Sequence, residues 1–253
     1  MKFTEYISTH QVFTTSDLMQ SMDSPSAAEE QLRLAVRAGK VERVRRGLLV
    51  SNYGRFGDVP VDPPAVVTAL DGDAIVSYHS ALDLHGVAHN VSFSFQFRSD
   101  ATRRAFTFRG VSYEPVGPVG GVEWRLMRAG TARMRVTTRE QTVIDCLDRP
   151  SRSGGVEEAV RSLTALPYID VGLLVALACR RSPATVSRVG WLLTRKAGDW
   201  SVSDERLARL EGMLGSGPYR LGRPRAGDSC WCRQWRLMLP ADSEEVATWI
   251  TRA

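Results

Sequence analysis

The sequence predicts an α+β protein, in which a small N-terminal domain of helices and one hairpin precedes a larger C-terminal domain of mixed α/β structure. The 253 residues exceed the usual size of one domain. Glycine and proline are concentrated between residues 54 and 64, as in a linker. Segments with a helical period flank alternating segments such as Val91–Phe97, so the second part combines helices with strands. We therefore expect domains at residues 1–55 and 65–253, joined by a linker at residues 56–64.

The composition is that of an ordinary globular protein. Hydrophobic residues make up 43% of the chain and charged residues 24%, which suffices for a packed core. No apolar run approaches the roughly 20 residues of a membrane span, and the first residues lack the apolar region of a signal peptide. Four cysteines are too few for a disulfide framework in a chain of this length. We expect a cytoplasmic protein with reduced thiols and no membrane partner.

The first 40 residues predict three short helices. Phe3, Tyr6 and Ile7 fall on one side of a helix over residues 3–10. Thr14 and Thr15 are N-cap candidates for a second helix, because a threonine oxygen accepts hydrogen bonds from the free amides of a first turn.

The third helix has the clearest boundaries. Ser24 is its N-cap candidate, Pro25 suits the first helical position, and Gly39 suits the left-handed position that follows a helix. One face carries apolar residues at i, i+4, i+7 and i+8, namely Ala28, Leu32, Ala35 and Val36.

A β-hairpin is predicted directly after the third helix. Val41 and Val44 lead into a turn at Arg46-Gly47, and Leu48 to Val50 lead out of it. Three helices followed by a two-stranded ribbon with arginines at its tip is the order of a winged helix-turn-helix. In that module the third helix enters the major groove of DNA, and the wing lies along the backbone or the minor groove.

Positive charge is concentrated in this module. Between Arg33 and Arg55 the sequence holds seven cations and the single anion Glu42, a net charge of +6, whereas the whole chain has +5. Such a segment is typical of a surface that contacts phosphates, although a solvated charged face accounts for the composition equally well.

We expect the DNA-contacting residues to lie in the third helix and the wing. They are Ser24, Ser26, Gln31, Arg33, Arg37, Lys40, Arg43, Arg45 and Arg46. The two serines at the helix start suit phosphate contacts. The glutamine and the two helix arginines suit base edges or nearby phosphates, and the four later cations suit the backbone. Glu29 and Glu30 argue against a phosphate contact at their part of the helix.

The C-terminal domain alternates between strand and helix patterns. The expected strands lie at residues 91–97, 106–108, 111–113, 122–127, 134–137 and 235–239. The expected helices lie at residues 65–70, 80–85, 139–146, 156–166, 171–179, 185–196 and 204–214, with a last helix capped by Asp242 or Ser243.

Several motifs resemble, in order, those of the AbiEi family, the DNA-binding antitoxins of bacterial type IV toxin–antitoxin pairs. Ser77–Gly86 resembles the family's "S-A-L-x-L-H-G" segment, and Val136–Leu147 resembles its "T-x-x-E-R-T-x-x-D" helix start, with Gln141 in place of arginine. Further resemblances are a glycine pair that opens a helix at Gly154–Glu158, an "L-G-x-L-L" at Val189–Leu193, and a wing "R-x-G-x-Y" at Arg45–Leu49 that lacks the aromatic residue. Together these motifs cover most of residues 1–240.

The resemblance implies a repressor that binds repeats at its own promoter in double-stranded DNA. It also implies a neighbouring nucleotidyltransferase toxin, which the C-terminal domain helps to neutralise, and it is compatible with self-association on DNA. An alternative is an antitoxin that acts by direct contact with its toxin, with DNA binding secondary. A nucleic-acid-modifying enzyme is a third, weaker reading.

Motifs that suggest catalysis or cofactors have structural interpretations, so we expect no enzyme, metal or cofactor. His79, His85 and His89 lack partners at ligand spacing. Cys230-Trp231-Cys232 has no second cysteine pair, and Thr138 with Gln141 suits a capping box. A second basic cluster, defined as residues 219–225 and 233–236, suits either an acidic partner or packing over tryptophans.

Overall fold

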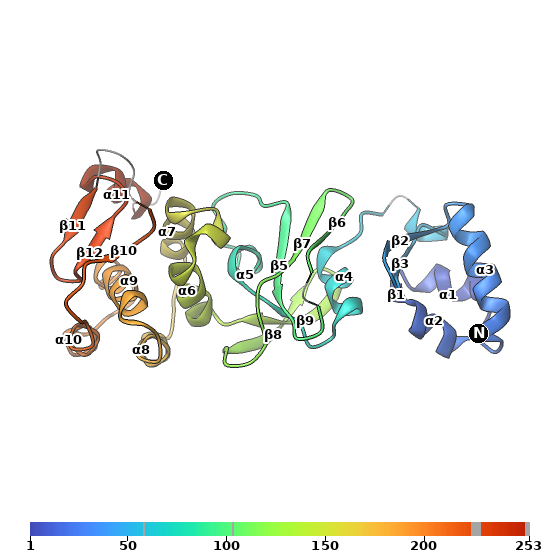
Figure 1. Cartoon of the computed structure of the whole chain (residues 1–253), viewed down its shortest axis with the longest axis horizontal. Coiled ribbons are helices and arrows are strands. Elements are labelled where there is room, and N and C mark those ends of the chain that lie inside the picture. The colour runs from blue at the N-terminus through green and yellow to red at the C-terminus, as the bar shows by residue number, and fades with distance from the viewer. Residues whose placement is uncertain (58, 103, 224–228, 251–253) are drawn as a thin grey trace. The chain divides into compact units, whose positions relative to one another are not determined.

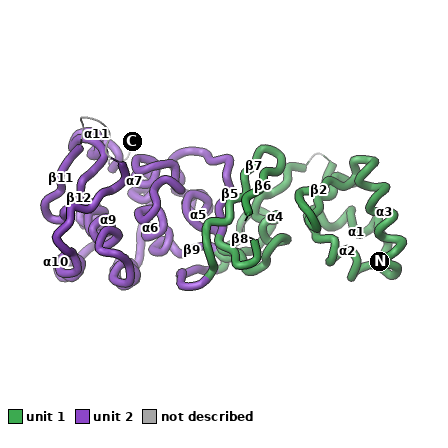
Figure 2. Tube along the Cα trace, in the orientation of Figure 1, with its two compact units in different colours: residues 1–75, 98–119, 126–135 green, residues 76–97, 120–125, 136–253 purple. Residues whose placement is uncertain are grey.

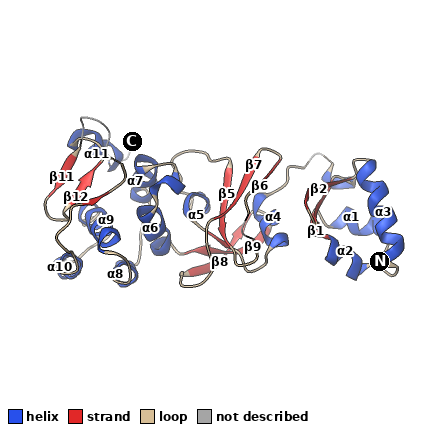
Figure 3. Cartoon of the chain, in the orientation of Figure 1, coloured by secondary structure: helices blue, strands red, loops and turns tan. Residues whose placement is uncertain are grey.

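The computed structural model describes residues 1–57, 59–102, 104–223 and 229–250 (Figure 1). The chain forms two compact units (Figure 2). The first comprises residues 1–75, 98–119 and 126–135, and the second comprises residues 76–97, 120–125 and 136–253. Both units mix helices with strands, as the α+β prediction requires (Figure 3). Asp58 of the expected linker and Pro224 and Arg225 of the second basic cluster lie outside the described residues.

The first unit begins with three helices and a small sheet. These elements are α1 (Phe3–Thr9), β1 (Val12–Thr14), α2 (Thr15–Ser21), α3 (Pro25–Arg37), β2 (Val41–Arg45) and β3 (Leu48–Ser51). The sheet has the order β1-β3-β2, and both pairings are antiparallel. The predicted helices and hairpin are confirmed, and β1 is a strand that the sequence prediction lacked.

Local side-chain chemistry sets the boundaries of these elements. The Thr14 hydroxyl accepts from the Asp17 amide at 3.0 Å while the Asp17 carboxylate accepts from the Thr14 amide, which is a reciprocal capping box. Gly39 and Gly47 have φ values of +69° and +81°, as the helix end and the wing turn require. Ser24 occupies the N-cap position of α3, but its side chain makes no capping hydrogen bond.

A compact apolar core holds this module together. It is formed by Phe3, Tyr6, Ile7, Phe13, Leu18, Leu32, Ala35, Val41 and Leu49. Because α3 and β2 both contribute to this core, the third helix and the wing are held in a fixed relation to each other.

The rest of the first unit contains a helix and a β-hairpin. Its further elements are the 3-10 turn η1 (Gly54–Phe56), α4 (Pro63–Leu70), β6 (Phe106–Phe108) and β7 (Val111–Pro115). Strands β6 and β7 pair antiparallel around a turn at Arg109-Gly110, where both residues have positive φ.

The segment that the sequence predicts as a linker, residues 56–64, makes hydrogen bonds to other parts of the first unit. The Asp62 carboxylate accepts from the Thr131 amide at 2.8 Å and occupies the space that a Cβ on Gly130 would need. The Gln11 side chain donates to the Val59 carbonyl at 3.3 Å. Helix α4 begins at Pro63, two residues before the predicted start.

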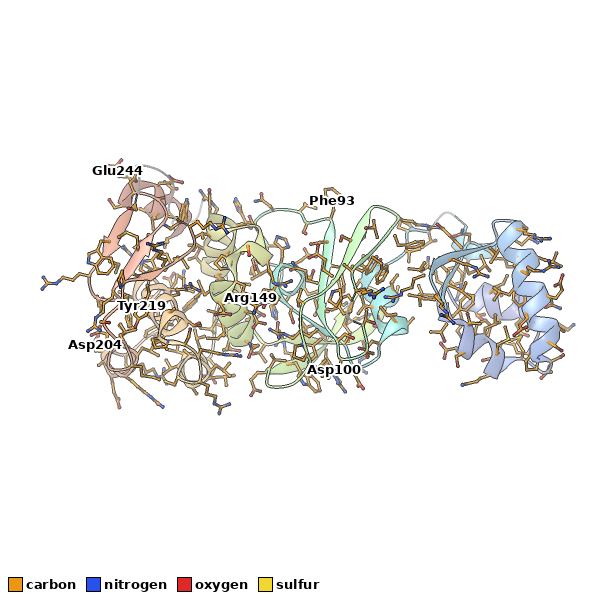
Figure 4. The ribbon with its side chains drawn as sticks, viewed as in Figure 1. Phe93, Asp100, Arg149, Asp204, Tyr219 and Glu244 are labelled. Carbon is orange, nitrogen blue, oxygen red and sulfur yellow. The ribbon has the colours of Figure 1, made fainter. Side chains whose placement is uncertain are left out.

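Strands β4 to β9 form a six-stranded sheet. Its order is β6-β7-β5-β4-β9-β8, with β4 at Ile75–Val76, β5 at Ser94–Arg98, β8 at Trp124–Ala129 and β9 at Ala132–Thr137. The alternating pattern at Val91–Phe97 predicts a longer strand than β5. Val91 and Phe93 instead precede the strand and are 86% and 76% exposed, and Figure 4 labels Phe93.

The second unit is a helical body with a small terminal sheet. Its helices are α5 (Tyr78–Leu84), α6 (Arg139–Asp148), α7 (Val156–Thr164), α8 (Val171–Ala178), α9 (Pro183–Arg195), α10 (Asp204–Glu211) and α11 (Ser243–Ile250), with a 3-10 turn η2 (Pro150–Ser153). Its small sheet has the order β10-β12-β11, formed by Tyr219–Arg220, Leu237–Leu239 and Cys230–Cys232. The predicted strand at residues 235–239 is confirmed in part, because Trp235 precedes β12 and is fully buried.

Several motif residues of the second unit have structural roles. The Thr138 hydroxyl accepts from the Gln141 amide at 3.2 Å and caps α6, as predicted. The Gln141 side-chain oxygen accepts from the Glu123 amide at 3.4 Å, and the Thr138 amide donates to the Glu123 carbonyl, so the capping box is not reciprocal there. The four cysteines are free thiols, with Cys146 buried and the other three half-buried.

Candidate nucleic-acid interface

A groove of about 650 Å³ lies between α2, α3 and the wing, which we define as β2, β3 and the turn at Arg46-Gly47. The start of α2 and the wing turn are joined where the Thr15 amide donates to the Gly47 carbonyl at 2.9 Å. We call this cavity the wing groove. The elements around it share one core, so the groove is a property of the folded module.

Five of the nine residues predicted to contact DNA line the wing groove. They are Ser26 and Arg33 from α3 and Arg43, Arg45 and Arg46 from the wing. Cations from two elements that are separate in sequence therefore converge on one cavity. Glu29 and Glu30 also line it, so the negative charge lies on its helix side.

The other four predicted residues lie elsewhere on the module. Ser24, Gln31 and Lys40 line a second groove of about 550 Å³ beside α1 and α3. The Lys40 ammonium lies 5.3 Å from the centre of the Tyr53 ring. Arg37 is exposed and lines neither groove. The nine residues thus do not form a single surface patch.

Arg33 is engaged within its own helix. Its Nε and Nη2 atoms donate to the two carboxylate oxygens of Glu30 at 2.9 and 2.5 Å. The hydrogen bond from Arg33 lowers the pKa of Glu30, so this exposed acid stays ionised. A DNA contact by Arg33 therefore has to compete with Glu30.

Arg45 differs from its exposed neighbours Arg43 and Arg46 because it is half-buried. Its guanidinium carbon lies 5.1 Å from the centre of the Phe106 ring, which belongs to β6. Its Nη1 atom is buried and has no hydrogen-bond partner among the described residues. The ring packing holds the side chain while this one donor is left unused.

The β6–β7 hairpin makes a second contact with the wing, through the Arg109 side chain. The guanidinium donates to the Glu42 carboxylate from Nε at 3.0 Å and from Nη2 at 2.6 Å. Nη2 also donates to the Asn52 amide oxygen at 2.7 Å. Sequence reasoning missed Phe106 and Arg109 because both lie more than 50 residues beyond the wing, and no local pattern indicates a contact with it.

The described residues show no other arrangement with an evident chemistry. They contain no cluster of three or more histidine, cysteine or acidic side chains that suits a metal ion. His79 instead pairs with the buried carboxylate of Glu158 at 3.3 Å. None of the helices within the described ranges is long and apolar enough to span a membrane.

Comparisons with known proteins agree with this geometry. Residues 4–51 match the model of a family described as "Transcriptional regulator, AbiEi antitoxin". A search of curated proteins finds no match. Among solved structures, the crystal structure of the RV2827C protein from Mycobacterium tuberculosis is similar, with a TM-score of 0.66 and 15% identity over 97% of this chain and 92% of that one. The chain therefore has a fold like that of the mycobacterial protein, and its residues 4–51 are similar to the AbiEi antitoxin transcriptional regulators.

Proposed function

We propose that this protein is a cytoplasmic, DNA-binding antitoxin that represses transcription of its own operon, whose toxin is a nucleotidyltransferase. The observation that carries the proposal is the convergence of Arg43, Arg45 and Arg46 on a groove that α3 also lines. The family matched by residues 4–51 supports the regulatory role. A regulator of this kind needs neither catalysis nor a cofactor, and we propose that this protein has neither.

The proposed binding mode places α3 in the major groove of double-stranded DNA and the wing on the adjacent backbone. The wing arginines would then contact phosphates, and Ser26 at the start of α3 would contact a phosphate through its hydroxyl or amide. Gln31 lies on another flank of α3 from the wing groove. It is our candidate for contacts with base edges, together with Arg33 after release from Glu30.

We further propose a division of labour along the chain. Residues 1–55 would bind the promoter, and residues 65–253 would counteract the toxin. The described part of the chain presents one such module, so tight binding to promoter repeats would involve two chains that associate on DNA.

A binding experiment with the protein's own upstream DNA tests the proposal. A fluorescent duplex of that region is titrated with the full chain at several salt concentrations, in the presence of mixed-sequence competitor. We expect binding that resists the competitor and weakens steeply with salt, because bound arginines release counterions from phosphates. Equal affinity for the upstream and mixed duplexes would refute autorepression.

A double variant tests the wing assignment within the same experiment. Arg45→Ala with Arg46→Ala should weaken binding to both duplexes and reduce the salt slope by about one unit per lost phosphate contact. The matched control is Arg180→Ala with Arg181→Ala, an adjacent exposed pair in the second unit that changes the net charge equally. Equal losses in the two double variants would remove the wing from the interface.

A second candidate function is direct contact with the toxin protein. The exposed apolar side chains of Val91 and Phe93 favour it, because large hydrophobic residues at a protein surface mark interaction sites when they cluster. Their loop is held by the buried Glu158 carboxylate, which accepts from the amides of His89 and Asn90 at 3.1 and 2.9 Å.

Binding to the purified product of the neighbouring gene tests this candidate. Phe93→Ser should weaken a direct complex while leaving promoter affinity unchanged. Leu126→Ser, at another exposed apolar residue, is the matched control. Absence of any complex between the two purified wild-type proteins would reject direct contact.

A further inference from the structure

We infer that the β6–β7 hairpin contributes to DNA binding through two side chains: Phe106 holds Arg45 in the wing groove, and Arg109 neutralises the charge of Glu42. Both are positioning residues that lie outside the N-terminal module. The inference rests on the proposed function, since it concerns how the wing meets the phosphates of DNA.

Arg109 changes the electrostatic potential of the wing by pairing with Glu42. Glu42 is the single anion between Arg33 and Arg55 and belongs to β2 of the wing. An unpaired carboxylate there would repel DNA phosphates and reduce the field of the neighbouring arginines. The Arg109 guanidinium donates from Nε and Nη2 to one oxygen of this carboxylate, Oε2, in two charge-assisted hydrogen bonds. The wing is thereby left with cations alone.

Phe106 restricts the conformation of the Arg45 side chain. A long arginine side chain at a wing has many rotamers, and fixing one of them at binding costs conformational entropy. Here the guanidinium rests on the Phe106 ring while the residue still lines the wing groove. Part of that entropy is therefore already lost before DNA arrives.

The Phe106 ring is itself fixed. It stacks on Tyr113 with a centroid distance of 4.7 Å and an interplanar angle of 4°. Tyr113 is 1% exposed, so the support for Phe106 comes from the interior of the unit. Arg45, Phe106 and Tyr113 form a continuous series of contacts from the groove to the core.

The position of Arg45 indicates the ligand. The residue is half-buried and lines the wing groove, while its Nη1 is enclosed and has no hydrogen-bond partner among the described residues. A phosphate oxygen in the wing groove would meet the charge of the guanidinium from the side that faces the groove. Arg45 is therefore the phosphate-binding residue that the hairpin prepares.

The experiment uses the full chain and the fluorescent upstream duplex. Phe106→Leu should lower the affinity about 3- to 10-fold and reduce the salt slope by about one unit, the same effect that we expect of Arg45→Ala. The double variant Arg45→Ala with Phe106→Leu should bind no more weakly than Arg45→Ala, because the two changes remove the same contact. Phe106→Tyr keeps an aromatic face and should bind like the wild type. Thr107→Val, at the exposed neighbour in β6, controls for changes to the hairpin.

A charge rescue tests the role of Arg109. Arg109→Gln should weaken binding, and Glu42→Gln in the same chain should restore it, because no carboxylate is then left to neutralise. If the hairpin acted only as a structural support, Glu42→Gln would not restore the DNA affinity that Arg109→Gln loses. If Arg109→Gln lowers the affinity and Glu42→Gln does not restore it, Arg109 does not act by neutralising Glu42.

The outcomes separate this inference from the proposed function. If the wild type fails to prefer its upstream duplex, the proposed function fails, whatever the variants do. If the wild type binds and Phe106→Leu matches Thr107→Val in affinity and slope, the hairpin has no part in binding. Tighter binding by Phe106→Leu would also overturn the inference, because Phe106 would then withhold Arg45 from DNA. Circular dichroism melting of each variant verifies that the compared chains are folded.

Discussion

The indole ring of Trp235 occupies the space that a Cβ atom on residue 190 would fill, since Cζ3 lies 2.0 Å from that ideal position. Gly190 belongs to the Val189–Leu193 motif of α9, and Trp235 directly precedes β12. The ring is fully buried, and its Nε1 donates to the Thr194 hydroxyl at 2.9 Å. The glycine of this motif is thus explained by the close packing of a helix against a tryptophan.

Gly190→Ala should destabilise the second unit. The added methyl group clashes with a ring that cannot move without breaking its hydrogen bond and its packing, so we expect a loss of about 1–3 kcal/mol. Urea denaturation followed by tryptophan fluorescence measures it. Gly198→Ala is the matched control, because nothing lies within 4 Å of a Cβ there and its φ is not positive. Equal midpoints for the two variants would contradict the packing explanation.

The buried Glu158 carboxylate should be far more important for stability than its neighbour Glu157. Glu158 is 4% exposed and accepts from the His89 amide, the Asn90 amide, the Asn90 side chain and the Ser162 hydroxyl. Glu158→Ala removes this shared acceptor, leaving the His89 amide only its bond to the Ser162 hydroxyl at 3.0 Å, and should cost about 3 kcal/mol. Glu157→Ala breaks a half-buried pair with Arg161 at the surface and should cost about 0–1 kcal/mol. Hydrogen exchange should also show faster exchange of the Asn90 amide in Glu158→Ala alone.

His85 should make the protein less stable as the pH falls below neutral. Burial lowers the pKa of His85 to about 4, although the hydrogen bond to the Thr137 carbonyl opposes the shift. The ring donates from Nε2 to that carbonyl at 2.9 Å, so Nδ1, which is buried without a partner among the described residues, would have to take up the second proton.

The sign of this effect follows from proton binding. Between the folded pKa of about 4 and an unfolded value of about 6.5, the unfolded chain binds more protons, so stability decreases with falling pH. We expect His85 to account for about 1–2 kcal/mol of the loss between pH 7 and pH 5, after allowance for its partial exposure. The free energy of unfolding, measured at both pH values, should change less in His85→Gln than in the wild type. An equal change in both proteins would contradict the burial argument.

The fold was predictable where the sequence carries long periodic patterns or strong punctuation. Pro25 and Gly39 bracket α3 within one or two residues, and the turn at Arg46-Gly47 was placed correctly. The short strands β1, β4, β10 and β11 were not predicted, because two or three residues give no measurable alternation. Val91 and Phe93 continue the alternation of β5 yet lie outside it, since alternation shows compatibility with a strand and not the presence of a pairing partner.

The candidate site was predictable only where it is local in sequence. Arg43, Arg45 and Arg46 stand within four positions, so a hairpin necessarily presents them together. The contacts of Phe106 and Arg109 with the wing depend on how the β6–β7 hairpin packs, and no local pattern encodes that packing. The separation of Gln31 from the wing groove likewise depends on which flank of α3 faces α1.

The Glu30 carboxylate should weaken DNA binding. It lines the wing groove and accepts both hydrogen bonds of Arg33, so it repels phosphates and occupies a cation that suits them. Glu30→Gln removes the negative charge and weakens the hold on Arg33. We expect the affinity for the upstream duplex to rise about 3- to 10-fold at low salt, and the gain to shrink as salt screens the charges. Glu205→Gln, at an exposed acid of α10, changes the net charge equally and should have little effect. An unchanged or lower affinity in Glu30→Gln would mean that this face of α3 points away from DNA, and base contacts would then have to come from the flank that carries Gln31.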